Sequence, residues 1–270
     1  MKKTLLSLAM AASLGLASGS ALALNAATDA QDVTIQESAI TGANSNQIIA
    51  DQLSGQYDEI FSVTSPNTFN TLAFFNAGAW YNNGSAIGSQ LNYFDTNGYK
   101  LYALFQSDGT FSVAGDGTVT FSGGNGTIQL WADASSNTTQ ALPGTAAGKT
   151  LADIVLGNTA DDVLLGSASL LSFGDGNGKP GGGANGNFEL VFGDWTLQAP
   201  DGQNYFIAPR PFYTILDLNG NFQAFDPTSQ TDILLTRSSA NAFFAVPEPG
   251  TIALLGIGLL GMGMGLRRKV

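Results

Sequence analysis

Carboxylates are the side chains of this 270-residue chain best suited to chemistry, because the sequence contains no histidine and no cysteine. That composition excludes Ser-His-Asp triads, Cys-His pairs, imidazole or thiolate metal sites and disulfide bonds. Asp58 with Glu59, or Glu189 with Asp194, could flank a sugar bond, because glycoside hydrolysis needs two carboxyl groups and no histidine. Residues 24–246 hold 20 acids, however, so accidental pairs are certain. We expect solvated acids at strand ends and turns, no catalytic site and no cofactor.

A calcium site is the second hypothesis for the acids. Residues 157–166, which include Asp161 and Asp162, are similar to one turn of a calcium-binding β-helix repeat, and Asp175 adds a further oxygen ligand downstream. Such repeats work by stacking, and no second copy with the same period follows. A turn is therefore the more usual explanation, and calcium remains a hypothesis.

Aromatic side chains offer a third possibility, because their rings can stack on sugars. Aromatic residues on strands more often pack in the core or across neighbouring strands. A secreted carbohydrate-binding module, or a carboxylate-dependent glycoside-active enzyme, therefore stays open as an alternative function. The candidate residues are Trp80, Tyr81, Tyr93, Trp131, Trp195 and Tyr205.

The charge of the chain limits its partners. The whole sequence has 10 Lys and Arg against 21 Asp and Glu, and residues 24–246 keep only five of those cations. Nucleic-acid binding depends mainly on Lys and Arg. A body with this excess of acids therefore argues against a nucleic-acid partner. A hydrophobic fraction of 44% with 11% charged residues indicates a packed core rather than a disordered chain.

Short strands are predicted along the body. Between residues 99 and 132 polar and apolar residues alternate, which is typical of half-buried strands. Turn dipeptides recur every 8 to 12 residues, at 97–98, 108–109, 116–117 and 125–126, and favour tight hairpins. The pattern predicts strands at about 99–106, 110–114, 118–122 and 127–132.

The rest of the body follows the same pattern, so the sequence predicts an all-β fold. We expect one antiparallel β-sandwich or barrel-like domain over residues 24–246. Residues 174–186 are rich in glycine and predict a loop, and 135–149 form a polar insertion. Further extended segments are expected at 32–40, 55–63, 69–81, 187–192, 195–198 and 203–207, with a turn at Asp201-Gly202 and a hairpin formed by 212–218 and 221–225.

The N-terminus has the three parts of a secretory signal peptide. Lys2 and Lys3 precede an apolar stretch at residues 5–16, and Ala21 and Ala23 form an A-x-A cleavage site. Residues 1–23 are therefore expected to form a signal helix that the Sec export machinery recognises and that is then removed.

The C-terminus has a second three-part signal at residues 247–270. Pro247, Glu248 and Pro249 favour an extended segment, because proline fixes φ and restricts the residue before it. An apolar run at 251–266 follows, long enough for a single short transmembrane helix. The basic cluster Arg267, Arg268 and Lys269 orients that helix with its C-terminus in the cytoplasm. The body is thereby predicted to lie outside the inner membrane, where the N-terminal signal also directs it.

This tail resembles the sorting signal of the PEP-CTERM proteins of Gram-negative bacteria. The resemblance implies recognition by an exosortase, a membrane-embedded cysteine transpeptidase, and removal of the tail near the Pro-Glu-Pro motif. It also implies a transient anchor in the inner membrane, followed by delivery of the body to the cell surface or extracellular matrix.

The body resembles the flocculation-associated PEP-CTERM proteins. The similar segments are 187–197, 205–213 and 217–222. This resemblance implies a non-enzymatic protein that promotes cell aggregation within an exopolysaccharide matrix. Because the body is acidic, we expect divalent cations to bridge its carboxylates to an anionic glycan, unless the glycan is neutral or rich in amino sugars.

Overall fold

The computed structural model describes residues 30–40, 46–91, 98–173, 176–178, 186–193, 195–220 and 232–246. The expected signal helix and its cleavage site (Ala21 and Ala23) lie outside the described residues, as does the tail with Pro247, Glu248, Pro249, Arg267, Arg268 and Lys269.

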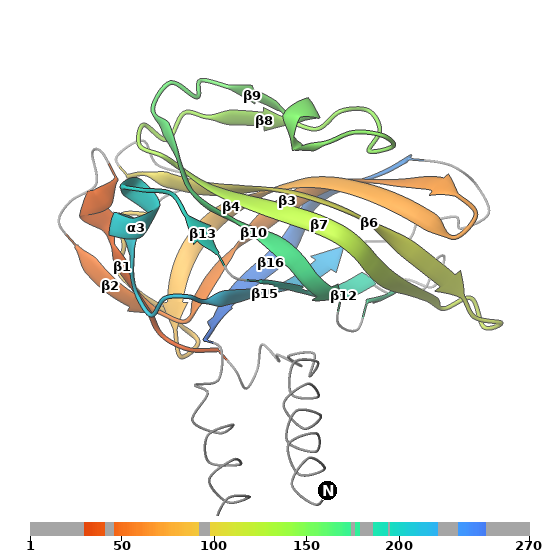
Figure 1. Cartoon of the computed structure of the whole chain (residues 1–270), viewed down its shortest axis with the longest axis horizontal. Helices are drawn as coiled ribbons and strands as arrows, with labels where there is room; N and C mark the ends of the chain where they lie inside the picture. Colours follow the sequence, from red (N-terminus) through yellow and green to blue (C-terminus); the bar gives the residue numbers. More distant parts are fainter. Residues whose placement is uncertain are drawn as a thin grey trace, which may run out of the picture.

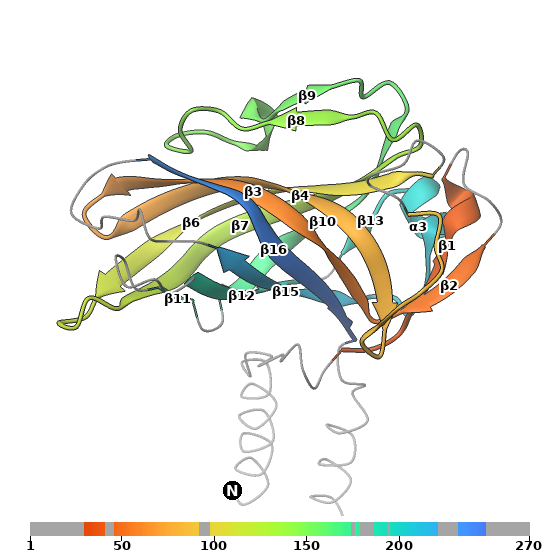
Figure 2. The same cartoon turned by 180° about the vertical axis from the view of Figure 1, so that it is seen from behind.

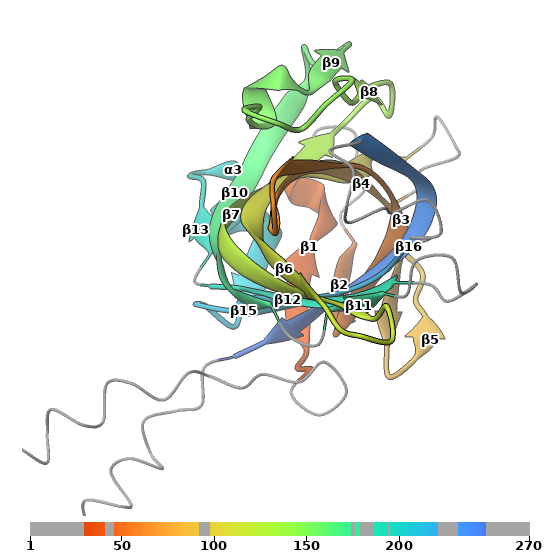
Figure 3. The ribbon, with the colours of Figure 1, turned by 90° about the vertical axis from the view of Figure 1, so that its right-hand side faces the viewer.

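Within the described residues, eight antiparallel strands follow one another around a closed ring. Each strand pairs with the next in the chain, and the last strand pairs with the first (Figure 3). An all-β antiparallel fold is thus confirmed, in the barrel-like form of the two arrangements expected. The strands are β3 (Gln52–Ser65), β4 (Thr68–Asn82), β6 (Lys100–Val113), β7 (Val119–Asp133), β10 (Asp162–Phe173), β12 (Gly186–Phe192), β15 (Tyr213–Gly220) and β16 (Asp232–Ala245).

Alternation along each strand divides its side chains between the two faces of the sheet. In β6, Leu101, Ala103 and Phe105 belong to the main core inside the ring. Their neighbours Tyr102 and Leu104 belong to a second core on the outer face. Successive side chains of a strand point to opposite faces of the sheet, and in this part of β6 the side chains on both faces are apolar.

The second core exists because a flap covers part of the outer surface. This flap, residues 134–161, contains β8 (Thr139–Ala141), β9 (Val155–Gly157) and the short 3-10 helix η2 (Leu151–Asp153), and it lies over β3, β4 and β6 (Figures 1 and 2). Ala146 and Ile154 of the flap are buried against the strands beneath. The polar insertion expected at 135–149 therefore covers an apolar face.

One end of the ring is closed by a cap. The cap is a three-stranded sheet in the order β14 (Phe206–Ala208), β1 (Val33–Gln36), β2 (Gln47–Ala50), together with η1 (Glu37–Ala39) and the short helix α3 (Asp201–Tyr205) (Figures 1 and 3). Its apolar residues, including Val33, Ile35 and Phe206, join the main core.

Part of the expected strand at 203–207 is wrong, because residues 201–205 are helical. The expected turn at Asp201-Gly202 is instead the start of α3. The helix packs closely on β10, where a Cβ atom at Gly202 would lie 1.7 Å from the Leu165 carbonyl oxygen. Glycine at this position permits that approach.

Two of the expected hairpin turns are also wrong. Asp108-Gly109 and Asn125-Gly126 lie inside β6 and β7, so the four short strands expected between 99 and 132 are two long ones. The pairing register shifts between Asp108 and Gly109, where a Cβ atom would lie 2.3 Å from the Ser122 carbonyl oxygen. Glycine inside a strand often marks such a bulge. Gly117, by contrast, occupies the expected turn between the two strands with φ +83°.

Three short strands complete the main sheet. They are β5 (Ser85–Ala86), β11 (Asn177–Gly178) and β13 (Thr196–Leu197). β11 pairs with β7 and β12, so part of the stretch at 174–186 that was expected to be a loop is a strand. The segment 221–225, expected as the second strand of a hairpin, lies outside the described residues.

The beginning and end of the body lie together at one end of the ring. The Gln31 amide donates a hydrogen bond to the Phe244 carbonyl oxygen at 2.7 Å, and the Phe244 amide donates to Asp51 at 3.2 Å. β16 ends at Ala245 beside the cap. The hairpins β3–β4 and β6–β7 are at the opposite end, because each strand runs antiparallel to its neighbour.

Candidate functional site: an aspartate cluster beside the flap

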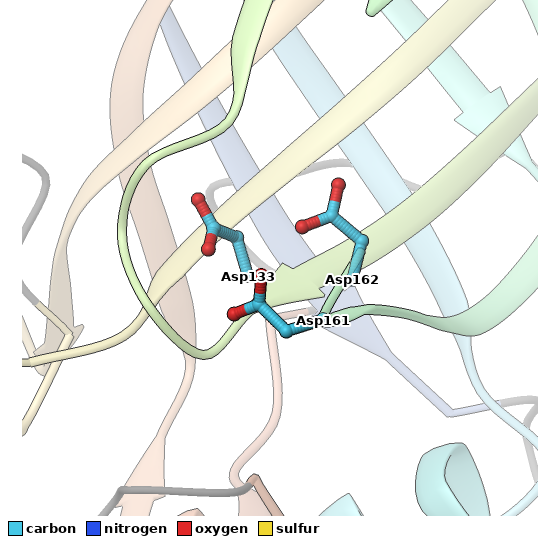
Figure 4. A group of neighbouring side chains, drawn as sticks. All are labelled: Asp133, Asp161 and Asp162. Carbon is cyan, nitrogen blue, oxygen red and sulfur yellow. The ribbon is translucent and has the colours of Figure 1, made fainter. Parts of the chain in front are cut away.

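Three aspartates meet where the flap leaves and rejoins the ring. Asp133 is the last residue of β7, Asp162 is the first residue of β10, and the two are register partners. Asp161 directly precedes Asp162. One carboxylate oxygen of each lies within 4.8 Å of the others, as the close view shows (Figure 4). The structure thus brings the two predicted residues Asp161 and Asp162 together with a third.

Hydrogen bonds from the start of the flap hold two of these carboxylates. Asp133 is completely buried and accepts hydrogen bonds from the backbone amides of Ser135, at 3.1 Å, and Thr138, at 2.7 Å. The same Ser135 amide also donates a hydrogen bond to the Asp161 carboxylate, at 2.7 Å. Both ends of the flap are therefore tied to each other.

Asp162 is held by two hydroxyl groups. The Tyr102 hydroxyl donates to it at 2.6 Å and the Thr138 hydroxyl at 2.7 Å. Burial raises the pKa of Asp162 above its ordinary value, and the neighbouring charges of Asp133 and Asp161 add to that effect, whereas the two hydroxyl donors oppose it. Burial and the bond to Asp162 also raise the pKa of Tyr102.

The cluster has the donor chemistry of a calcium site, because calcium prefers carboxylate oxygens. Each carboxylate, however, already accepts at least one hydrogen bond from the protein, so the same arrangement serves to anchor the flap without an ion. Asp175, the other acid in the calcium hypothesis, lies outside the described residues. Calcium binding at Asp161 and Asp162 remains a prediction.

Of the two carboxylate pairs considered for glycoside hydrolysis, the structure describes both members of one pair only. Asp58 and Glu59 are consecutive in β3 and point to opposite faces of the sheet. Asp58 accepts a hydrogen bond from the Arg237 amide at 2.6 Å, whereas Glu59 is buried among the lining of the interior. Glu189 of β12 has Asp217 as its register partner, and Asp194 lies outside the described residues.

The aromatic candidates for sugar stacking mostly pack inside the protein. Trp80 and Tyr205 are completely buried. Trp131 stacks in parallel on Tyr102 with ring centroids 6.3 Å apart. Trp195 donates its indole N–H to the Thr214 hydroxyl at 2.7 Å, Tyr81 is a half-buried residue of β4, and Tyr93 lies outside the described residues.

A buried polar network at the cap was not expected from the sequence. The Glu37 carboxylate is completely buried and accepts hydrogen bonds from the Tyr99 hydroxyl at 3.1 Å, the Gln90 amide at 2.8 Å and the Asn46 side chain at 3.1 Å. The hydroxyls of Tyr99 and Tyr205 lie 2.6 Å apart, and burial raises the pKa of both. These contacts join the cap to the connection between β4 and β6.

Comparison with known protein families identifies the C-terminal segment. Residues 245–269 match the family model of the PEP-CTERM protein-sorting motif. The chain carries a PEP-CTERM sorting signal. The motif implies export, membrane-anchored sorting toward the cell surface and processing by an exosortase. It begins where β16 ends, at Ala245.

The other comparisons add no relatives of this chain. No curated protein matches it, and no solved structure does. Among the residues that the structure describes, none forms a helix both long and apolar enough to cross a membrane.

Proposed function

We propose that this protein promotes cell aggregation at the bacterial surface, as in flocculation and biofilm formation, together with exopolysaccharide. The observation that carries the proposal is the PEP-CTERM motif at residues 245–269, because it supports delivery of the body to the cell surface by an exosortase. The resemblance of residues 187–197 and 205–213 to flocculation-associated PEP-CTERM proteins supports the finer role. The proposed role is structural or adhesive and non-catalytic.

The direction of the strands supports an outward-facing contact surface. The sorting motif continues from β16 at the capped end, so the hairpin β6–β7 lies at the far end of strands that span about 45 Å. Four exposed hydroxyl residues form facing pairs near the tip of that hairpin, Thr110 with Ser122 and Ser112 with Thr120. Hydroxyl groups of this kind can exchange hydrogen bonds with the hydroxyls of a glycan.

The charge of the body supports a contribution from divalent cations. Residues 24–246 carry 20 acids against five Lys and Arg. Lys149 forms a salt bridge with Asp153, with the two atoms 3.0 Å apart. Because the acids outnumber the cations four to one, internal cations can neutralise only a small part of the negative charge, and a divalent ion could bridge the remainder to an anionic polysaccharide.

Deletion of the gene in its native host tests the proposal. The deletion strain is complemented with the full chain or with a chain that lacks residues 247–270, and floc formation is scored by settling rate. We expect flocs only with the full chain. Normal flocculation of the deletion strain would refute the aggregation role.

A further inference from the structure

The outer face of the ring changes from apolar to polar along its strands. Under the flap, the outward side chains of β6 are apolar, as Tyr102 and Leu104 show. Beyond the flap, toward the hairpin tips, the outward positions of β4, β6 and β7 are polar. Phe69, Phe105 and Phe121 alternate with these positions and belong to the main core. The polar residues form rows of register partners across the three strands: Asn70 with Asp108 and Asn125, and Thr68 with Thr110 and Ser122.

Two adjoining hollows lie over these rows. The hollow beside Lys149 of the flap has a volume of about 380 Å³, and the one nearer the hairpin tips, beside Thr110, has a volume of about 430 Å³. Asn70 and Asp108 line both hollows, which therefore form one trough, the distal groove. Each part has the size of an ordinary ligand site. The stretch of β6 from Gln106 to Thr110 alone gives the groove a length of about 13 Å.

Several polar side chains of the groove are free of hydrogen bonds from the protein. In the described part of the chain, the side chains of Asn70, Thr127 and Ser169 make none. The Gln106 side-chain oxygen accepts a hydrogen bond from the Leu151 amide at 2.8 Å, which holds this side chain and leaves its NH2 group available. Amide and hydroxyl side chains both donate and accept hydrogen bonds, as the hydroxyls of a sugar do. The groove therefore offers groups that complement a sugar chain.

Gly124 leaves the centre of the groove open. It is the extra residue of the bulge, between the register partners of Asp108 and Gly109. Its φ lies outside the left-handed region, so the bulge does not itself require glycine here. A Cβ atom at Gly124 would lie 2.9 Å from a carboxylate oxygen of Asp108. Glycine inside a strand often marks a place where a ligand approaches the backbone closely, and here it keeps the Asp108 carboxylate accessible.

We propose that the distal groove binds a run of uncharged sugar residues of a polysaccharide, with Asn70 and Asp108 at its centre. This inference rests on the proposed function, because it names the surface by which the body contacts exopolysaccharide. Within the described part of the chain, the charged residues of the groove are Asp108 and Lys149, and Lys149 is paired with Asp153 at 3.0 Å. That pairing leaves no free cation in this part of the groove for an anionic sugar, whereas the Asp108 carboxylate can accept strong hydrogen bonds from sugar hydroxyls.

Biolayer interferometry on the full chain in lipid nanodiscs tests the proposal, with empty nanodiscs as the reference. The probes are the neutral and the acidic fractions of exopolysaccharide isolated from the native host and separated by anion exchange. We expect the parent to bind the neutral fraction. Asn70→Ala and Asp108→Ala should each weaken that binding about tenfold, because each removes a hydrogen bond to the sugar. Asn137→Ala removes an exposed amide from the flap and is the matched control, which should leave binding unchanged.

A second pair of variants blocks the groove and keeps its polar groups. Gly124→Val covers Asp108 and should also weaken binding at least about tenfold. Gly88→Val, in the connection between β4 and β6, adds a side chain whose Cβ atom meets nothing within 4 Å and should have no effect. Only variants with the near-UV circular dichroism of the parent are compared. Equal binding by the parent and by the folded groove variants, binding of the acidic fraction alone, or no binding by the parent would overturn the proposal.

Floc formation separates the failure of this proposal from the failure of the aggregation role. The deletion strain is complemented with the parent or with the Asp108→Ala chain, and we expect slower settling with the variant. Flocs that require the gene, with no binding of the neutral fraction by the parent, would refute the groove and leave the aggregation role standing. Binding that depends on Asp108, in a host that flocculates normally without the gene, would uphold the groove and refute the aggregation role.

Discussion

Replacement of Glu59 by glutamine is expected to change how the stability of the protein depends on pH. Glu59 is buried, and that burial raises its pKa from 4.5 to about 7, whereas the hydrogen bond from Thr71 opposes the rise. In the unfolded chain the carboxyl titrates near its ordinary value. Between pH 4.5 and 7 the unfolded chain therefore releases a proton that the folded protein keeps, and this favours unfolding as the pH rises.

The size of the effect follows from the two pKa values. A rise from 4.5 to about 7 corresponds to a free-energy difference of about 3 kcal/mol. This carboxyl alone thus lowers the free energy of unfolding by about 3 kcal/mol at pH 8 relative to pH 4. Glu59→Gln keeps the size and the hydrogen-bond acceptor but cannot ionise, so the variant should lose this contribution.

Urea unfolding of the purified protein at a series of pH values measures the difference. The variant should match the parent within about 1 kcal/mol near pH 4 and become more stable than the parent, by up to about 3 kcal/mol, at pH 8. Asn137→Gln changes an exposed side chain without adding or removing an ionisable group and serves as the control, with a nearly constant difference from the parent across the same range. A difference between Glu59→Gln and parent that does not change with pH would refute the reasoning.

Three more predictions follow from other contacts. Gly202→Ala places a methyl group against the β10 backbone and should lower the free energy of unfolding, measured by urea titration, by about 2 kcal/mol or more. The control is Gly144→Ala, whose added methyl group meets nothing within 4 Å and should have little effect. Asp133→Ala leaves the buried Thr138 amide without its acceptor, whereas the Ser135 amide keeps its bond to Asp161, and the change should cost roughly 1–3 kcal/mol. Hydrogen exchange in the flap should become faster, and unchanged exchange would contradict the anchoring role. Flocs should disperse in a chelator and re-form on addition of calcium or magnesium, and persistence of flocs in the chelator at several ionic strengths would refute cation bridging.

Alternation of residue types predicted that residues 99–132 are extended, and which face of β6 points inward, but not where the strands end. Tyr99, Leu101, Ala103 and Phe105 alternate with more varied residues, and all four are buried in the main core. What alternation could not predict was that the opposite face of the same strand is covered as well. The flap that covers Tyr102 and Leu104 is distant from them in the sequence. A contact between such distant segments leaves no local pattern in the sequence.

Two of the dipeptides that predicted hairpin turns lie instead inside strands, next to an irregularity in the pairing. Asp108-Gly109 and Asn125-Gly126 have the composition of tight hairpin turns, and both lie within long strands. Asp108 is the register partner of Asn125, so these dipeptides face each other across β6 and β7. The sequence of one strand cannot reveal that a partner strand supplies the matching irregularity.

The candidate sites likewise combine residues that the local sequence can indicate with residues that only the fold brings close. Asp161 and Asp162 were predicted from the similarity of residues 157–166 to one turn of a calcium-binding repeat, but Asp133 joins them only through the register of β7 with β10. Glu59 could have been recognised as inward-facing, because it alternates with Tyr57 and Phe61, which are both buried. That signal was available in the sequence, and the reading of Glu59 as a solvated acid was wrong.

The measurement that tests the central claim most directly is the intact mass of the protein recovered from the outer surface of producing cells. Sorting by an exosortase predicts a chain that begins after Ala23 and ends near Pro247–Pro249, without Arg267, Arg268 and Lys269. An unprocessed C-terminus on the surface form, or recovery of the protein only from the inner membrane, would contradict the account.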